Sequence, residues 1–261
     1  MEEEYRAHPG VNHSTLKHFA RGAAHANLVQ TKKVKETDAM RLGTLVHLMV
    51  LEPHLVEDQV AVTPEVNRRT KAGKEELAKF REQNKGKMTY TADEYGQAVL
   101  MAGAARSHPA AKALLDDLAY AEVERYWRDE IFGIECKCKI DGVTAGSRMF
   151  DVKTTIDASP SAFSRAIFNN YYHTQAAWYM FGNGVSQGPP AHSYSIIAIE
   201  KAEPFDVVVY ELSKQSIDLG MKQVMEWLRD YHYAKKSDNW VSHPEEVLVE
   251  PPQWLLSKEQ L

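Results

Sequence analysis

Three strand-like runs at the centre of the chain constrain its fold more than any other feature. The runs AYAEVERYW, IECKCKID and GSRMFDVKT, within residues 119–154, are joined by short connections that contain Gly133, Gly142 and Gly146. Short glycine-containing connections between strands are typical of antiparallel hairpins. The pattern therefore predicts an antiparallel meander, and the later runs HSYSIIAIE and FDVVVYEL predict two further strands.

Amphipathic spacing predicts helices on both sides of these strands. Residues 12–28 fit one helix behind a Ser14 cap, and residues 37–53 fit a second helix that Pro53 ends. The remaining helices are expected after a capping box at 91–94, at about 160–168 and 172–182, and behind a Ser213 cap. The pattern predicts an α/β fold with a mixed central sheet flanked by helices and an N-terminal helical extension.

The length and composition of the chain fit one sizeable core. The chain has 261 residues, 44% of them hydrophobic, and no internal repeat or obvious linker interrupts it. We therefore expect a single domain over residues 1–261. Its parts would be a mainly helical segment over 10–110, a catalytic sheet with helices over 118–235, and an irregular tail over 237–261.

Charge and cysteine content exclude several classes of protein. The formal net charge of −5 argues against a chain coated in basic surface, without excluding a local basic groove. Cys136 and Cys138 lie too close together for an unstrained disulfide, and two cysteines cannot supply a four-cysteine iron–sulfur cluster. The chain has no long apolar run, so we expect a cytoplasmic protein with reduced thiols that is neither exported nor bound in a membrane.

Two strands of the predicted meander carry polar faces. Alternate side chains of a strand share a face, so Asp151 and Lys153 point the same way, as do Lys137, Lys139 and Asp141. If the strands pair, these carboxylates and lysines form one patch. Two nearby carboxylates repel each other, and hard oxygen ligands suit Mg²⁺ or Mn²⁺. With a lysine to stabilise charge on a phosphate, the patch has the parts needed for metal-assisted phosphodiester hydrolysis.

These residues and others nearby also have plainer interpretations. An Asp-x-Lys pair on a strand is usually an ordinary ion pair, and a lone histidine in an apolar helix, such as His47, is usually a satisfied core group. Gln175 and Tyr179, four residues apart, fit one face of an amphipathic helix. Glu122 and Glu124 fit a solvated strand edge. Taken singly, the residues leave both interpretations open.

Five motifs in order, GTLVH, AEVERYW, CKIDG, FDVKT and QAAWY, resemble the PD-(D/E)XK nuclease superfamily. Within it, GTLVHLMVLEP, VTPEVNRRTKAGKEE and CKCKID look like the RecE-type exonucleases of prophage origin, with more distant similarity to phage lambda exonuclease. The resemblance spans about residues 10–240. It implies a restriction-endonuclease-like core.

The resemblance implies a metal site at the polar patch. His47, Asp141 and Asp151 would be metal ligands together with the backbone carbonyl of Val152, and Lys153 would be the signature lysine that positions the attacking water. In place of the signature proline before the first aspartate, this chain has Ile140. That proline shapes a turn and is not a ligand, so the difference removes no chemistry.

The resemblance also assigns supporting residues. Glu122 would help to hold the attacking water or a second metal ion, with Glu124 as the alternative for this role. Gln175 and Tyr179 match a Q-x-x-x-Y motif, so both would brace the catalytic site and touch DNA.

The function implied by the resemblance is a processive 5′→3′ exonuclease for double-stranded DNA. It would use Mg²⁺, with Mn²⁺ able to substitute and two ions in each site, and it would release nucleotides with a 5′-phosphate. The 3′ overhang would serve a single-strand annealing protein of the RecT or Bet type, and the enzyme would form a ring of three or four copies in a bacterial host cytoplasm. Alternatives are an endonuclease of restriction or repair and an inactive DNA-binding adaptor.

Residues 67–87 form a strongly basic segment. They hold eight Lys or Arg against three Glu, so this segment nets +5 within a chain that nets −5. We expect Arg68 and Arg69 to contact DNA phosphates, and Lys137 and Lys139 to line the DNA path. The alternative for the segment is a solvated charged helix.

Overall fold

A mixed five-stranded sheet forms the centre of the computed structural model, which describes residues 2–32 and 36–251. The strands lie side by side in sequence order, and β3, β4 and β5 form the predicted antiparallel meander. β6 pairs with β5 in parallel and with β7 antiparallel. The predicted α/β fold class is confirmed. The strand bounds are β3 (Leu118–Arg128), β4 (Glu135–Thr144), β5 (Arg148–Thr155), β6 (Ser193–Glu200) and β7 (Val207–Glu211).

Gly142 lies inside β4 and not in a connection, so that detail of the prediction is wrong. A Cβ atom at this position would come within 2.3 Å of the Phe150 ring on the neighbouring strand. The missing side chain therefore lets Phe150 pack close against β4, where both strands are still paired.

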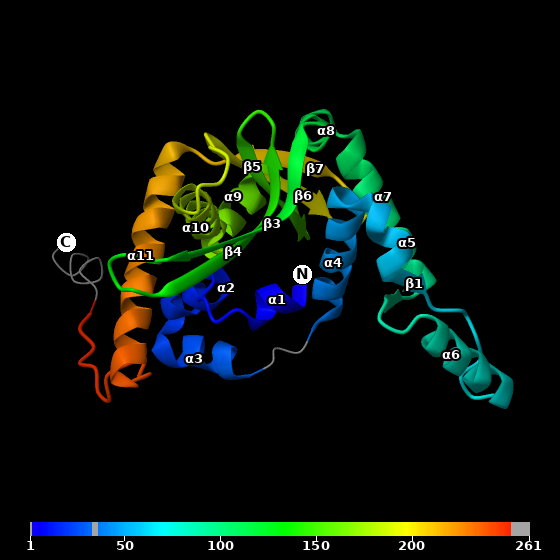
Figure 1. Cartoon of the computed structure of the whole chain (residues 1–261), viewed down its shortest axis with the longest axis horizontal. Helices are drawn as coiled ribbons and strands as arrows, with labels where there is room; N and C mark the ends of the chain where they lie inside the picture. The colour runs from blue at the N-terminus through cyan, green and yellow to red at the C-terminus, as the bar shows by residue number, and fades with distance from the viewer. Residues whose placement is uncertain (1, 33–35, 252–261) are drawn as a thin grey trace, which may run out of the picture.

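Helices cover both faces of the sheet, as Figure 1 shows. Met149 and Ile196 pack in the core cluster that includes residues of α10 and α11, whereas Phe150 and Ile197 pack in the cluster that includes residues of α4 and α7. Successive residues of β5 and β6 therefore face opposite layers, as strand alternation requires. The helix bounds are α4 (Asp38–Leu51), α7 (Ala92–Ser107), α8 (Pro109–Asp116), α9 (Pro160–Asn169), α10 (Tyr172–Val185) and α11 (Lys214–Ser237).

The helix predicted over 12–28 is broken into separate pieces. Asn12, not Ser14, caps the first piece, because its side chain accepts a hydrogen bond from the Thr15 amide at 2.9 Å. Gly22, at φ 109°, ends the second piece in a conformation that a helix cannot continue. The pieces are α2 (His13–Leu16), the 3₁₀ helix η1 (Lys17–Arg21) and α3 (Ala23–Thr31), and they follow α1 (Glu2–Ala7).

The predicted helix over 37–53 is confirmed as α4. Thr37 caps it by accepting a hydrogen bond from the Met40 amide. The predicted capping box is also present, since Thr91 and Glu94 each bond to the other's backbone at the start of α7. These two helices pack against each other and cover the face of the sheet on which Phe150 lies.

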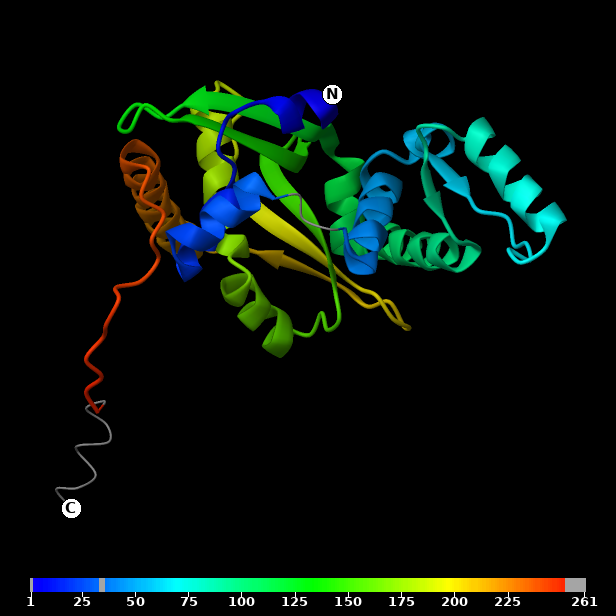
Figure 2. The same cartoon turned by 90° about the horizontal axis from the view of Figure 1, so that it is seen from below.

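Residues 60–90 form a projection that we call the arm (Figure 2). It contains a pair of parallel three-residue strands and one helix, which Thr70 caps. The first of these strands directly follows a short helix. The elements here are η2 (Pro53–Leu55), α5 (Val56–Gln59), β1 (Val60–Val62), α6 (Lys71–Gln83) and β2 (Met88–Tyr90).

After α11, described residues 239–251 have no helix or strand, as predicted for the tail. Trp240 anchors the start of this segment, with its ring 6.5 Å from that of Phe19 and 6.1 Å from that of Tyr231. Among the described helices, none is long and apolar enough to cross a lipid bilayer.

Candidate active site

The site forms where strands β4 and β5 separate. Their pairing is confined to Gly142 with Phe150 and Val143 with Met149. One residue further on, the amide of Val152 donates to Asp141 Oδ2 at 2.8 Å. A carboxylate thus replaces the strand partner of this amide, and the separated strands leave room for side chains from both.

A histidine reaches this opening from helix α4. His47 Nε2 donates to the carbonyl oxygen of Val152 at 2.5 Å, and His47 Nδ1 lies 3.4 Å from Asp141 Oδ2. His47 is therefore not a core group, because its side chain is 28% exposed and both ring nitrogens face polar atoms of the separated strands. The packing of α4 on this face of the sheet holds the ring there.

A glutamate reaches the same place from strand β3. Glu122 adopts a left-handed conformation at φ 52°, which is uncommon for a residue other than glycine and interrupts regular strand geometry. Its carboxylate forms an ion pair with Lys139. Glu124 instead accepts a hydrogen bond from the Tyr126 hydroxyl at 2.6 Å. Of the two predicted alternatives, the geometry therefore places Glu122 in the site.

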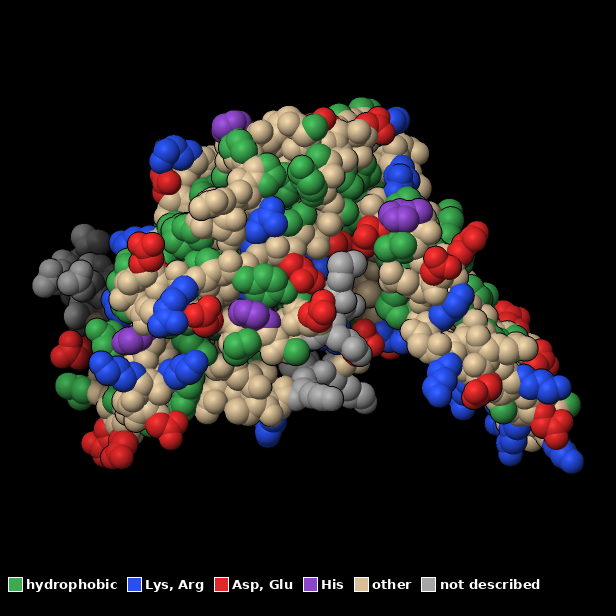
Figure 3. Space-filling view, in the orientation of Figure 1, with side chains coloured by type: hydrophobic (Ala, Val, Ile, Leu, Met, Phe, Trp, Pro, Cys, Tyr) green, Lys and Arg blue, Asp and Glu red, His purple; other side chains and the backbone are tan. Residues whose placement is uncertain are grey.

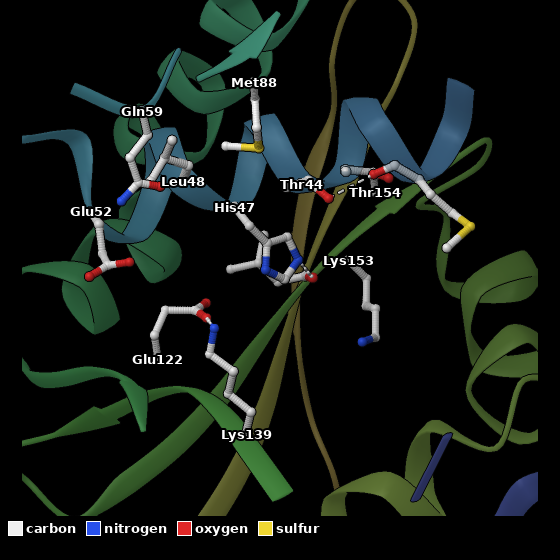
Figure 4. A pocket seen from close by; sticks show the side chains of 13 residues that line it. Thr44, His47, Leu48, Glu52, Gln59, Met88, Glu122, Lys139, Lys153 and Thr154 are labelled. Atoms are coloured by element: carbon white, nitrogen blue, oxygen red, sulfur yellow. Dashed lines mark hydrogen bonds and ion pairs between the residues drawn. The ribbon is translucent and has the colours of Figure 1, made fainter. Parts of the chain in front are cut away.

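His47, Glu122 and Asp141 offer ligand atoms that all lie within 4.8 Å of one another. Figure 4 shows His47 and Glu122 pointing into the same cavity from different elements, with Lys139 and Lys153 beside them. The cavity has a volume of about 530 Å³ and also has the backbone of Val152 in its lining.

A second group of side chains lies next to this cluster. Lys153 Nζ is 2.6 Å from Asp151 Oδ2, and Gln175 Nε2 donates to Asp151 Oδ1 at 2.8 Å. The Asp151 side chain is only 2% exposed, and its Oδ2 is buried with the Lys153 ion pair but no hydrogen bond. The sequence prediction grouped Asp151 with the metal ligands, but among the described residues the structure brings only His47, Glu122 and Asp141 into the compact cluster.

Burial and charge perturb the acids and the lysine of the site. Burial, with the neighbouring charge of Asp151, raises the pKa of Asp141 from 3.8 to about 7, and His47 and Lys153 offset part of that rise. Burial alone would lower the pKa of Lys153, but the carboxylates of Asp151 and Asp141 outweigh it and raise that pKa above its usual value. The lysine therefore stays charged, while Asp141 lacks a sufficient counter-charge.

This donor set fits a hard divalent cation. It combines carboxylate oxygens, one imidazole nitrogen and a nearby backbone carbonyl, which are ligands that Mg²⁺ and Mn²⁺ accept. The raised pKa of Asp141 is the observation that tests the fit, because a cation would relieve the repulsion between Asp141 and its acidic neighbours. His47, Glu122, Asp141 and the carbonyl of Val152 are the groups that could hold it, and Asp151 lies next to them.

The model of a PDDEXK-like domain of unknown function, DUF3799, matches residues 12–249. The chain belongs to this family. The resemblance to the PD-(D/E)XK superfamily is thereby confirmed.

The chain is also similar to solved structures. The fold is similar to that of a candidate exonuclease from Eubacterium rectale, with a TM-score of 0.62 and 14% identity over 100% of this chain and 98% of that one. LHK-Exo, an alkaline exonuclease from Laribacter hongkongensis, matches with a TM-score of 0.34 and 12% identity over 92% of this chain and 100% of that one. No curated protein matches the sequence.

One predicted DNA contact is wrong. Lys137 is buried, and its ammonium donates to the backbone carbonyls of Tyr5 at 2.6 Å and His8 at 2.7 Å. The N-terminal segment covers this position, so the lysine fastens that segment to β4 and does not line an open surface. Lys139, by contrast, lines the cavity as predicted for a residue near the DNA path.

The other predicted DNA contacts include Tyr179, in the body of the protein, and Arg68 and Arg69, on the arm. Tyr179 is partly buried against the core, and burial with the charge of Asp151 raises the pKa of its hydroxyl well above the usual value. Its place beside Asp151 fits a bracing role. Arg68 and Arg69 are exposed in the turn before α6, on the arm and outside the residues that line the cavity.

Two residues of the site were not predicted. The Tyr172 ring lies 5.0 Å from Lys153 Nζ, where it shields one side of the ammonium. Its position three residues before Gln175, on the same helix face, could have indicated it. Glu52 lines the cavity, and burial with the charge of Glu122 raises its pKa. Sequence carried no signal for Glu52, because α4 and β3 meet only in the fold.

Proposed function

We propose that this chain is a metal-dependent deoxyribonuclease that removes nucleotides from the ends of double-stranded DNA. The observation that carries the proposal is the convergence of His47, Glu122 and Asp141 next to a cavity that His47, Glu122 and the charged Lys153 line. Membership of a PDDEXK-like family supports the same proposal.

A divalent cation held by His47, Glu122, Asp141 and the Val152 carbonyl, with Asp151 adjacent, would acidify a water molecule and polarise a phosphate oxygen. Lys153 contributes a fixed positive charge at the place where negative charge builds on the scissile phosphate. Asp151 holds the ammonium at 2.6 Å, and Gln175 in turn fixes Asp151 at 2.8 Å. The lysine is therefore oriented before DNA arrives, and it needs no rearrangement during the reaction.

The finer features of the proposal are 5′→3′ polarity, processive digestion and Mg²⁺ as the natural ion. They are supported by the stretches GTLVHLMVLEP, VTPEVNRRTKAGKEE and CKCKID, which resemble RecE-type exonucleases. The E. rectale candidate exonuclease has a similar fold over nearly the whole of both chains, which fits an exonuclease role. We further propose that the 3′ overhang is passed to a single-strand annealing protein and that a ring of copies encloses the duplex.

The direct test is digestion of a linear duplex with Mg²⁺ by the wild type and by two variants. Lys153→Ala and Asp151→Asn should both abolish nucleotide release, and EDTA should abolish it in the wild type. Full activity in either variant would remove the proposed site.

A covalently closed circle separates an exonuclease from an endonuclease. The proposed enzyme leaves the circle intact and digests it after linearisation. Cleavage of the intact circle would show that an end is not required and would favour the endonuclease alternative.

A further inference from the structure

The arm carries a charge opposite to that of the rest of the chain. Residues 67–87 net +5 within a chain that nets −5, so all other residues together carry −10. Segregating cations onto one projection concentrates positive potential there, although the protein as a whole is acidic.

Helix α6 divides its charges between two flanks. Gly73 and Leu77 are its buried residues and mark the face that packs on the rest of the arm. On one flank, Lys71, Lys74 and Arg81 follow a spacing of i, i+3 and i+10, so they form one row along the helix. Glu76 and Lys79 lie on the opposite flank, whereas Glu75 and Glu82 lie along the outer edge of the row, next to Lys71.

The row of cations is solvent-exposed and mostly unneutralised. Lys71, Lys74 and Arg81 are all exposed. Among the described residues, only Lys71 has a carboxylate within ion-pair distance, Glu75 at 3.9 Å, and both side chains of that pair are highly exposed. Exposed pairs of this kind contribute little, so the row keeps its positive charge for a partner outside the chain.

The arm begins at the wall of the active-site cavity. Gln59, next to β1, and Met88, at the start of β2, both line that cavity with His47 and Lys153. In Figure 3, Lys and Arg side chains gather along the edge of the arm that faces the body and at its tip, whereas most acidic side chains of the arm lie elsewhere. A polyanion that leaves the cavity on this side meets the arm next.

We propose that the row formed by Lys71, Lys74 and Arg81 binds the phosphate backbone of the undigested duplex outside the active site. The proposal rests on the proposed function, because it takes DNA as the ligand. From Lys71 to Arg81 the helix rises about 15 Å, which is the length of roughly four base pairs. Arg68 and Arg69, in the turn before α6, extend the same basic surface. Contacts of this kind hold DNA regardless of its sequence, as an enzyme that moves along its substrate requires.

The test measures affinity for a fluorescent duplex of about 30 base pairs as a function of salt, with EDTA present to prevent cleavage. Each phosphate contact adds about 0.9 to the slope of log K against log salt, so the triple variant Lys71→Gln, Lys74→Gln, Arg81→Gln should lower that slope by about 2.7. Lys74→Gln alone should lower it by about 0.9. The matched control is Lys79→Gln, which removes the same charge from the opposite flank and should leave the slope unchanged.

A gain-of-contact variant makes the test independent of any loss of folding. Ala78 is exposed between Lys74 and Arg81 on the cationic flank. Because Ala78 is also three residues from Glu75 and four from Glu82, the lysine is introduced in a Glu75→Gln, Glu82→Gln background, where Ala78→Lys fills this gap and should raise the slope by about 0.9. Equal slopes for Lys74→Gln and Lys79→Gln, or no gain with Ala78→Lys, would overturn the proposal. A change in oligomeric state without a change in slope would overturn it too, by assigning the row to contacts between copies.

The result is separable from the nuclease proposal. If the wild type binds DNA with these slopes but never cleaves it, the arm proposal stands and the nuclease proposal fails. If the wild type cleaves DNA and the slopes do not move, the arm proposal fails alone.

Discussion

The cavity and the arm differ in how their charged side chains are placed: buried and paired near the cavity, exposed and mostly unpaired on the arm. In the cavity, Asp151 and Lys153 are removed from water and held at 2.6 Å, so each depends on its neighbour. On the arm, Lys74 and Arg81 stand in solvent, with no ion-pair partner among the described residues. Buried charges are strong, specific and costly to change, whereas exposed charges are weak, additive and sensitive to salt. Single substitutions should therefore be severe in the cavity and mild on the arm.

The largest effect is expected at Lys153. Lys153→Ala removes the fixed positive charge at the scissile phosphate and should lower kcat roughly 10²–10³-fold in a nuclease assay. The control is Lys214→Ala, which removes an exposed lysine paired with Asp218 on α11 and should leave kcat unchanged. A Lys153→Ala variant that folds normally and retains wild-type kcat would contradict the expectation that substitutions in the cavity are severe.

Asp141 should lower the stability of the metal-free chain, although metal binding requires it. Its pKa in the folded, metal-free chain is about 7, above the ordinary 3.8, so folding binds this proton more tightly. The contribution of Asp141 to stability is therefore lost as pH rises from about 4 to about 7. Asp141→Asn should make the metal-free chain more stable above pH 7, by on the order of a few kcal/mol, while Mn²⁺ binding is lost.

Urea unfolding of variant and wild type at pH 5 and pH 8, with EDTA, measures this effect. The informative quantity is the difference between the two chains, because groups remote from Asp141 titrate equally in both. A difference that does not grow with pH would show that Asp141 carries no uncompensated charge.

Substitution of Lys137 should lower the stability of the protein without changing its affinity for DNA. Lys137→Met leaves the carbonyls of Tyr5 and His8 without their donor, and we expect it to lower the free energy of unfolding by about 1–3 kcal/mol. Its DNA affinity should equal that of the wild type once folded protein is compared. A weaker affinity with unchanged stability would restore Lys137 to the DNA path.

A smaller effect should separate the two glutamates of β3. Glu122→Gln removes a negative charge from the cluster with His47 and Asp141 and should weaken Mn²⁺ binding roughly tenfold, as measured by calorimetry. Glu124→Gln changes only a hydrogen bond with Tyr126 and should leave the affinity unchanged. The reverse order would make Glu124 the supporting acid.

Sequence predicted the features that depend on short-range patterns. The threonine that begins the capping box at Thr91, the alternation that puts Asp151 and Lys153 on one face, and the order of the strands all follow from neighbouring residues. The family resemblance added His47, whose partners are far away in the sequence.

Features that depend on contacts between residues far apart in the sequence could not be predicted from it. Lys137 alternates correctly with Lys139, and only the N-terminal segment that folds over it makes it a buried residue. The backbone of Glu122 is left-handed, and its side chain lies in the cluster. No glycine stands at this position, so the sequence did not indicate a left-handed conformation. The projection of the arm likewise depends on packing. The positive charge of residues 67–87, by contrast, could be counted from the sequence.

The central claim is that three groups from separate elements hold one cation beside Lys153. Anomalous diffraction from crystals grown with Mn²⁺ tests it most directly. The account predicts an anomalous peak in the cavity, at about 2.1 Å from ligand atoms of His47, Glu122 and Asp141. No peak there at saturating Mn²⁺, with the Asp141 carboxylate turned away from His47, would contradict it.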